Sequence, residues 1–191
     1  MATAEAAEVC DLVTRGFEEF VAPDYSRLGV EEFLRFASPA AMLERIQRGG
    51  LVLVAEDGGM LAGMAELRGN SHISLLCVDK AYQRRGIAGE LVRRGTEVCR
   101  NRKPGLAQVT VNSSPYAVPV YLRLGFAVTG PEQEVHGIRF TPMALDLGGS
   151  PAQPAADPSP MQDFYARYYA AIAASHAYAS FCKRAYGRDF G

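Results

Sequence analysis

Apolar side chains recur every three or four positions in the first fifty residues of the chain, as they do along one face of an amphipathic helix. The first run is interrupted at Pro23, and a second run covers residues 30–36. Ser38 and Pro39 are typical of a helix start, because serine caps free amides and proline suits the first turn. A pair of glycines then ends the pattern. We therefore expect three helices within residues 3–49.

The period then changes to that of β-strands. Residues 51–55 and 60–67 are short apolar runs joined by Glu-Asp-Gly-Gly, which is typical of a hairpin turn. Several strands before one long helix, followed by strand, helix and strand, predict an α/β (α+β) fold with a mixed sheet and helices on both faces. The remaining expected elements are a strand at 73–78, a helix at 86–102, a strand at 107–112, a short helix at 116–124 and strands at 126–129 and 137–147.

The end of the chain differs in composition from the rest. Residues 148–160 are small and proline-rich, which predicts a linker. Residues 161–191 are dense in alanine and tyrosine and predict an appended C-terminal helix. This segment faintly resembles the opening helix of some S-adenosylmethionine-dependent methyltransferases, but it contains no cofactor motif and we assign it no such activity. We expect it to dock on its own domain, residues 1–147, or on a neighbouring subunit, in which case the protein would be a homodimer.

Charge and cysteine content exclude several classes of function. The net charge is −1, so no overall field attracts nucleic acid or a membrane surface. The four cysteines, Cys10, Cys77, Cys99 and Cys182, are widely spaced and match no metal-ligand pattern. The N-terminus lacks the features of a secretory signal, and no apolar run reaches the ~18 residues of a membrane helix. We therefore expect a cytoplasmic protein with reduced thiols and no metal.

The most informative segment is ISLLCVDKAYQRRGIAGELV, residues 73–92. An apolar strand runs into a turn at residues 83–88 and then directly into a helix. Gly86 lets the backbone come close to a ligand, and the first amides of a helix lack intrahelical partners at the positive end of its dipole. Such a turn binds phosphate or pyrophosphate through backbone N–H groups, and Arg84 and Arg85 add positive charge.

A second motif lies downstream, in VNSSPYAVPVYLRLGF, residues 111–126. Together the two segments resemble the GNAT superfamily of acetyl-CoA-dependent N-acetyltransferases, and the resemblance covers residues 1–147. One position departs from the family pattern: the asparagine often found seven residues before the tyrosine is Ser114 here, and Asn112 lies two residues earlier. The family's pyrophosphate signature is met by Gln83, Gly86 and Ala88, and its later motif by Ala117, Tyr121, Gly125 and Phe126.

The resemblance implies the fold and the way in which acetyl-CoA binds. The sheet would be of the mixed, mostly antiparallel GNAT type, and the strands 73–78 and 107–112 would splay apart. Pantetheine would pair with the edge of the first strand, where a backbone N–H can also stabilise the oxyanion of a tetrahedral intermediate. The implied coenzyme contacts are Cys77, Val78, Gln83, Arg84, Arg85, Gly86, Ile87, Ala88, Asn112 and Tyr116.

The resemblance also points to a proton donor but not to a base. Tyr121 is the expected donor to the departing thiolate, since a phenol stays protonated at neutral pH; the alternative is a core aromatic. Three candidates remain for the base. Glu66 is the acid within an otherwise apolar strand, His72 titrates in a useful range, and a water chain to solvent would serve equally well.

These residues together predict an N-acetyltransferase that moves an acetyl group to a primary amine of a small molecule or protein. The amine would attack directly, through a tetrahedral intermediate. A non-catalytic acyl-CoA sensor is the alternative that the linker and the appended helix leave open. A dinucleotide-binding Rossmann half is excluded because G-x-G-x-x-G is absent. Residues 22–48 and 130–140 are expected to shape the acceptor site, and the arginines of the 86–102 helix to form its solvated face.

Overall fold

The computed structural model describes residue 1 and residues 3–148, so the predicted linker lies outside the described residues except for Gly148, and the predicted C-terminal helix lies wholly outside them. The three expected N-terminal helices are present: α1 (Thr3–Phe20), α2 (Arg27–Phe36) and α3 (Pro39–Gln47). A single 3₁₀ turn, η1 (Ala22–Asp24), separates the first two. The Ser38 side chain accepts a hydrogen bond from the amide of Ala41, which confirms the predicted start of the third helix.

The strands form one sheet with the order β1-β2-β3-β4-β7-β5, and β6 pairs with the outer part of β7. All pairs are antiparallel except β3 with β4. The mixed, mostly antiparallel sheet is therefore confirmed, whereas β6 was not predicted. The strands are β1 (Leu51–Asp57), β2 (Met60–Arg68), β3 (His72–Val78), β4 (Gln108–Ser113), β5 (Ala127–Val128), β6 (Gln133–Val135) and β7 (Ile138–Asp146).

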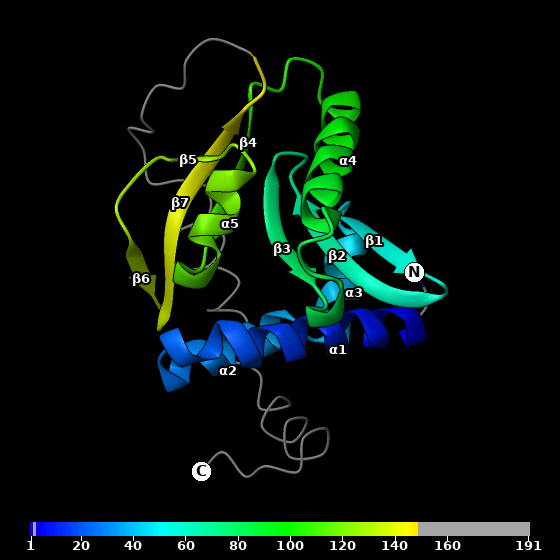
Figure 1. Cartoon of the computed structure of the whole chain (residues 1–191), viewed down its shortest axis with the longest axis vertical. Coiled ribbons are helices and arrows are strands. Elements are labelled where there is room, and N and C mark those ends of the chain that lie inside the picture. Colours follow the sequence, from blue (N-terminus) through cyan, green and yellow to red (C-terminus); the bar gives the residue numbers. More distant parts are fainter. Residues whose placement is uncertain (2, 149–191) are drawn as a thin grey trace. The chain divides into compact units, whose positions relative to one another are not determined.

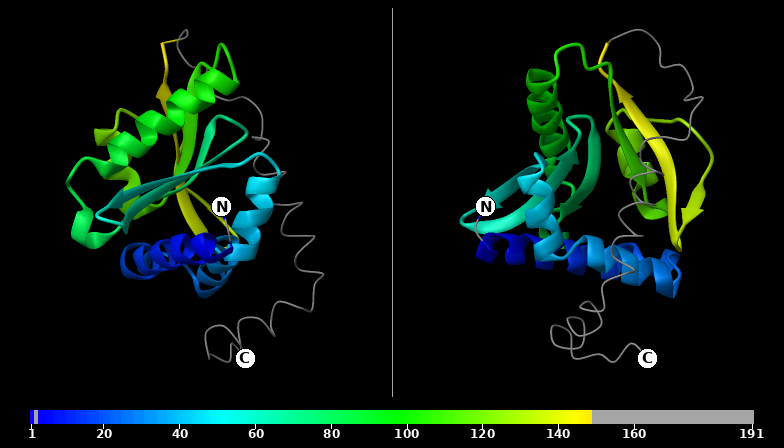
Figure 2. Two further views of the ribbon diagram at one scale, coloured as in Figure 1. Left: turned by 90° about the vertical axis from the view of Figure 1, so that its right-hand side faces the viewer. Right: turned by 180° about the vertical axis from the view of Figure 1, so that it is seen from behind.

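Helices cover both faces of the sheet (Figures 1 and 2). One face carries α4 (Ile87–Arg102) and α5 (Val118–Arg123), which follow the 3₁₀ turns η2 (Lys80–Tyr82) and η3 (Pro115–Ala117). Ala65 and Leu67 of β2 join the core on this side, together with side chains of α4 and α5. The intervening Glu66 points to the other face, where α1 and α3 pack, because side chains alternate along a strand. No helix in the described part of the chain is long and apolar enough to cross a bilayer.

Candidate active site

β3 and β4 pair over two residues of each strand and then diverge. Their parallel ladder joins His72 to Thr110 and Ile73 to Val111, and it ends there. β3 continues through residues 74–78, still paired with β2 on its other edge. The β4-facing N–H and C=O groups of this stretch have no strand partner, and all but the Val78 carbonyl, which accepts from Gln83, are open to a ligand. The splay that the family resemblance implied is therefore present (Figure 1).

A β-bulge lies in β3 where the two strands part. The register between β2 and β3 shifts between Glu66 and Leu67, whose partners are Leu75 and Ile73, so Ser74 is the extra residue. Bulges end regular pairing and turn backbone groups in new directions. The Ser74 hydroxyl is buried and has no hydrogen-bond partner among the described residues. Sequence reasoning missed this residue, although a single hydroxyl in an apolar strand was a usable signal.

The turn that follows β3 leaves the first amides of α4 uncapped. Arg84 and Gly86 have φ angles of 61° and 83°, in the left-handed region that favours glycine. Gly86 is the N-cap, so no side chain bonds the helix start, and the first α-helical bond runs from the Glu90 amide to the Gly86 carbonyl. The amides before Glu90 are therefore available to a ligand at the positive end of the helix dipole. The predicted geometry of an anion-binding turn at residues 83–88 is present.

Two side chains of this turn donate to backbone carbonyls that precede it in the chain. Gln83 Nε2 donates to the carbonyl of Val78 at 3.3 Å, which ties the turn to the end of β3. Arg85 donates to the carbonyl of Ala81 at 3.0 Å. Arg84 and Arg85 are both exposed, so their charges lie at the rim of the turn. Ile87 and Ala88 form the first turn of α4, beside the same free amides.

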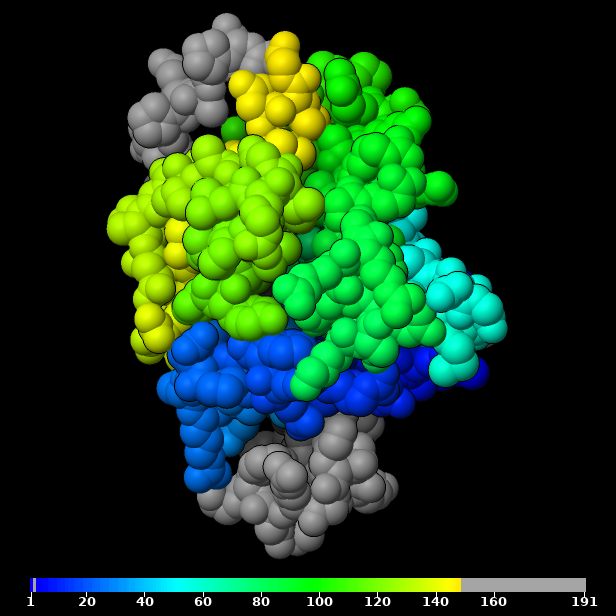
Figure 3. Space-filling model, viewed as in Figure 1, coloured from blue at the N-terminus to red at the C-terminus, as the bar shows by residue number. Residues whose placement is uncertain are grey.

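The C-terminal end of α1 joins the segments that follow the two diverging strands. Glu19 forms an ion pair with Lys80 of η2, after β3. Phe20 stacks on Tyr116 of η3, after β4, with 5.0 Å between the ring centroids. Tyr116 is 45% exposed. α1 thus lies across the open end of the β3–β4 gap, and Tyr116 lies at that end. Figure 3 shows α4 and α5 side by side on this face, with the segment of α1 and α2 in blue below them.

The Cys77 side chain and the Asn112 side chain lie on the face opposite to α4. Cys77 Sγ is 3.6 Å from the carbonyl of Leu12 in α1. Burial raises the pKa of this thiol to about 11. Asn112 follows the last β3–β4 pair, and strand alternation puts its side chain on the face of Thr110, opposite to the buried Val111. The Cys77 side chain is therefore directed toward α1 and not into the gap.

Tyr121 lies on α5, on the face of the sheet that carries α4. Its side chain is part of the core and meets Phe126 edge-on at 5.1 Å. Burial raises the pKa of the phenol above its usual value, so the hydroxyl keeps its proton at neutral pH. The ring is thus a core aromatic and its hydroxyl is a potential proton donor, so the two interpretations of Tyr121 are compatible.

Glu66, one of the candidates for the base, forms a buried ion pair. Its side chain is fully buried, and both carboxylate oxygens accept from Arg45 of α3, at 2.5 and 2.8 Å. Arg45 also donates to the carbonyl of Phe36 at 2.7 Å. Removing the negative charge of a buried ion pair would leave the arginine uncompensated. The pair therefore fastens α3 and the end of α2 to β2, and it is poorly suited to proton abstraction.

His72 lies at the closed end of the gap. Its Nδ1 is 2.8 Å from Thr110 Oγ1, across the last parallel pairs of β3 and β4. Burial lowers the pKa of the imidazole to about 3, with a further contribution from Arg68. The ring is therefore neutral at pH 7 and a weak proton acceptor. The structure brings His72 and Glu66 neither to each other nor to the turn at 83–88.

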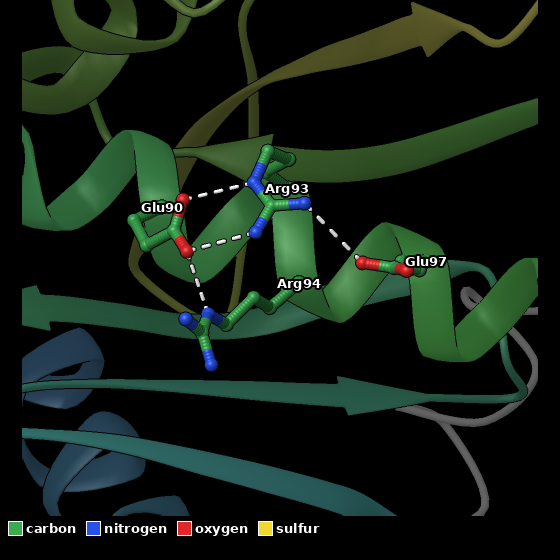
Figure 4. A network of polar contacts seen from close by, with 4 residues as sticks. All are labelled: Glu90, Arg93, Arg94 and Glu97. Atoms are coloured by element: carbon green, nitrogen blue, oxygen red, sulfur yellow. Dashed lines mark hydrogen bonds and ion pairs between the residues drawn. The ribbon is translucent and has the colours of Figure 1, made fainter.

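The arginines on the outer face of α4 are held by acidic neighbours one turn away. Arg93 donates to both carboxylate oxygens of Glu90, at 2.9 and 2.8 Å, and to Glu97 at 3.3 Å (Figure 4). Arg94 donates to Glu90 at 2.6 Å. All four side chains are exposed. This is the solvated helix face that the sequence predicted.

The sequence profile of the acetyltransferase (GNAT) domain matches residues 21–147. The match includes the opening between β3 and β4, the turn at 83–88 and Tyr121. The chain belongs to the GNAT acetyltransferase family.

Solved structures share this fold. A GCN5-related N-acetyltransferase from Rhodopseudomonas palustris is 24% identical with a TM-score of 0.66, covering 77% of this chain and 92% of that one. PaiA N-acetyltransferase from Thermoplasma acidophilum, solved with coenzyme A, is 18% identical with a TM-score of 0.61, covering 76% and 95%. A ribosomal-protein-alanine N-acetyltransferase from Brucella melitensis is 19% identical with a TM-score of 0.55, covering 77% and 97%. No curated protein matches the sequence.

Proposed function

We propose that this protein is an N-acetyltransferase that moves the acetyl group of acetyl-CoA to a primary amine by direct attack. One observation carries the proposal: the unpaired edge of β3, residues 74–78, leads directly to the uncapped start of α4. The edge offers amide hydrogen bonds to an extended chain with its own amides. The helix start offers free N–H groups to an anion. Coenzyme A carries matching groups in the same order: the amides of pantetheine come first and the pyrophosphate anion follows.

The coenzyme contacts follow from this arrangement. The pyrophosphate binds the backbone amides of residues 84–88, with Arg84 and Arg85 at its rim. The pantetheine amides pair with the backbone near Cys77 and Val78. Gln83 acts indirectly, by holding the turn against the end of β3. Tyr116 and Asn112 bound the gap from the side of β4.

The chemistry requires a proton donor for the thiolate and a positive group near the oxyanion. Tyr121 supplies the proton, because its buried phenol stays protonated at neutral pH. A backbone N–H of β3 at the splay stabilises the tetrahedral oxyanion. Cys77 takes no covalent part: its thiol faces α1, and a pKa of about 11 keeps the nucleophilic thiolate scarce. Direct attack by the amine therefore replaces an acetyl-cysteine intermediate, and its proton leaves through water.

The test is acetyl transfer by the purified full chain. Acetyl-CoA is offered with a panel of small primary amines and of peptides with free N-termini or lysines. Coenzyme release is followed with a thiol reagent, and the acetylated product is identified by mass. We expect turnover with at least one amine. Coenzyme binding without transfer to any member of the panel would contradict the proposal and favour the acyl-CoA sensor.

A further inference from the structure

α2 connects structural elements on the two sides of the β3–β4 gap. At its start, the amide of Ser26 donates to the carbonyl of Gly137, in the turn between β6 and β7, at 3.3 Å. A Cβ on Gly29 would lie 2.0 Å from the same carbonyl, so only glycine permits this approach. At its end, Phe36 accepts from Arg45, which is ion-paired with Glu66 of β2. β7 lies beyond β4, and β2 lies beyond β3, so α2 spans the gap.

Glu32 lies midway along α2, on its buried face. Gly29, Glu32 and Phe36 are the buried residues of the helix, and their spacing of three and four places them on one face. Glu32 is 7% exposed, although neither β-strand pairing nor a helix cap requires an acid there. Gly29 contacts the turn between β6 and β7, and the Phe36 carbonyl accepts from Arg45, so Glu32 lies between the two attachments of α2.

The two oxygens of the Glu32 carboxylate differ in their hydrogen bonds to the described residues. Oε1 accepts from Arg35 Nη1 at 2.9 Å. Oε2 is buried and has no hydrogen-bond partner among the described residues. A buried carboxylate oxygen without a partner is costly, since it has lost water and gained nothing in return. Such an atom is expected where a ligand supplies the missing donor.

The surroundings of Glu32 favour a cationic donor. Burial raises the pKa of the carboxyl, and Arg35 and His136 oppose that rise. An ammonium bound to Oε2 would lower the pKa of the carboxyl, as Arg35 does, and would donate a charge-assisted hydrogen bond to this oxygen. A neutral hydroxyl could donate to the same oxygen, but it would bring no charge.

We propose that Glu32 Oε2 binds the ammonium group of the acceptor, and that the acceptors of this enzyme are therefore cationic amines. The inference rests on the proposed function, because it supplies the amine of that reaction. The coenzyme binds from the side of the α4 start and the acceptor enters beneath α2, so the two substrates reach the gap from different elements.

The test is amine binding to the CoA-saturated full chain, measured by calorimetry. The probes are cadaverine, tyramine and Nα-acetyl-lysine amide, with 1-pentanol as the uncharged control. Glu32→Gln keeps an oxygen for Arg35 and removes the charge, so amine affinity should fall tenfold or more. Glu31→Gln is the matched control: it removes the same charge one residue away, where Glu31 pairs with Arg27 at 3.0 Å on an exposed part of α2. Its amine affinity should equal that of the wild type.

Three results would overturn the inference: no probe amine binds the wild type, Glu32→Gln binds amines as tightly as the wild type, or Glu31→Gln loses affinity equally. With a turned-over amine, Glu32→Gln should raise KM and leave kcat within threefold. A fall in kcat at constant KM, with a changed pH profile, would make Glu32 a base and also contradict the inference. If Glu32→Gln does not fold, Glu32→Asp retains the charge, withdraws it by one methylene and should still weaken binding.

This experiment separates the inference from the proposed function. Amine binding requires no turnover, so it is measured even if no acetyl group moves. Acetyl transfer that is unaffected by Glu32→Gln would refute the inference and leave the proposed function intact. If amine binding depends on Glu32 but the protein transfers no acetyl group, the proposed function is refuted and the amine site at Glu32 is supported.

Discussion

Tyr121 combines a packing role with a proposed chemical role, and a single oxygen separates them. Tyr121→Phe keeps the ring against Phe126, so melting temperature and coenzyme affinity should barely change. If the hydroxyl protonates the thiolate, kcat should fall about 10²-fold, in the usual range for a general acid. Steady-state rates with an amine from the panel measure this effect.

The control for that variant is Tyr82→Phe, which removes a phenol oxygen from η2 and leaves α5 unchanged. Its turnover should match that of the wild type. Wild-type turnover by Tyr121→Phe, when chemistry limits the rate, would show that another group delivers the proton.

His72 makes stability depend on pH. The unfolded chain protonates this histidine below about pH 6.5, whereas the folded chain resists protonation down to about pH 3. The neutral ring therefore makes its full contribution to the free energy of unfolding above pH 6.5. This contribution is lost as the pH falls, by at most about 1.4 kcal/mol per pH unit. His72→Gln can still bond Thr110 but does not titrate. Urea unfolding at pH 7.5 and 5.5 should show a smaller loss in the variant than in the wild type, and equal losses would contradict the assignment.

At the scale of elements, the turn before α4 is the proposed phosphate site. Gly86→Glu would put a carboxylate where the pyrophosphate binds, and acetyl-CoA affinity should fall tenfold or more, or about 1.4 kcal/mol. Calorimetry on the folded variant measures this loss.

The other end of α4 provides a matched control. Gly105 also has a positive φ, of 80°, and an added Cβ would have no atom within 4 Å. Gly105→Glu should therefore cause similar backbone strain without affecting acetyl-CoA affinity. If the two variants bind acetyl-CoA equally well, the pyrophosphate does not bind at residues 83–88.

The helices and longer strands were predictable, because their periodicity and breakers are local. β6 was missed because three residues carry too little pattern, and it pairs only with the start of β7. The predicted strand at 126–129 contracts to two residues, Ala127 and Val128. Pairing with a partner, rather than composition, decides how far such short strands extend.

At the scale of the whole molecule, the elements described around the gap belong to residues 3–147, the part that supplies the proposed coenzyme contacts. Deleting residues 150–191 should therefore leave acetyl-CoA affinity unchanged. The sequence of the tail is rich in tyrosine and alanine, so its removal should instead alter solubility or oligomeric state, as measured by light scattering. Loss of coenzyme binding in a truncated chain that still folds would show that the tail completes the site.

The sequence by itself determined the parts of the site that are local in the chain. Gly86 and the helix that follows it define an anion-binding turn through their own backbone, and the spacing to Tyr121 indicated the family. Only the tertiary structure decided which buried carboxylate forms a complete ion pair and which keeps one oxygen without a hydrogen bond from the described residues. Glu66 pairs with Arg45 because α3 packs on β2, and Glu32 faces inward because α2 spans the gap. The sequence does not show on which face of its element a charged residue lies, and only the packing of the elements determines which partner it meets.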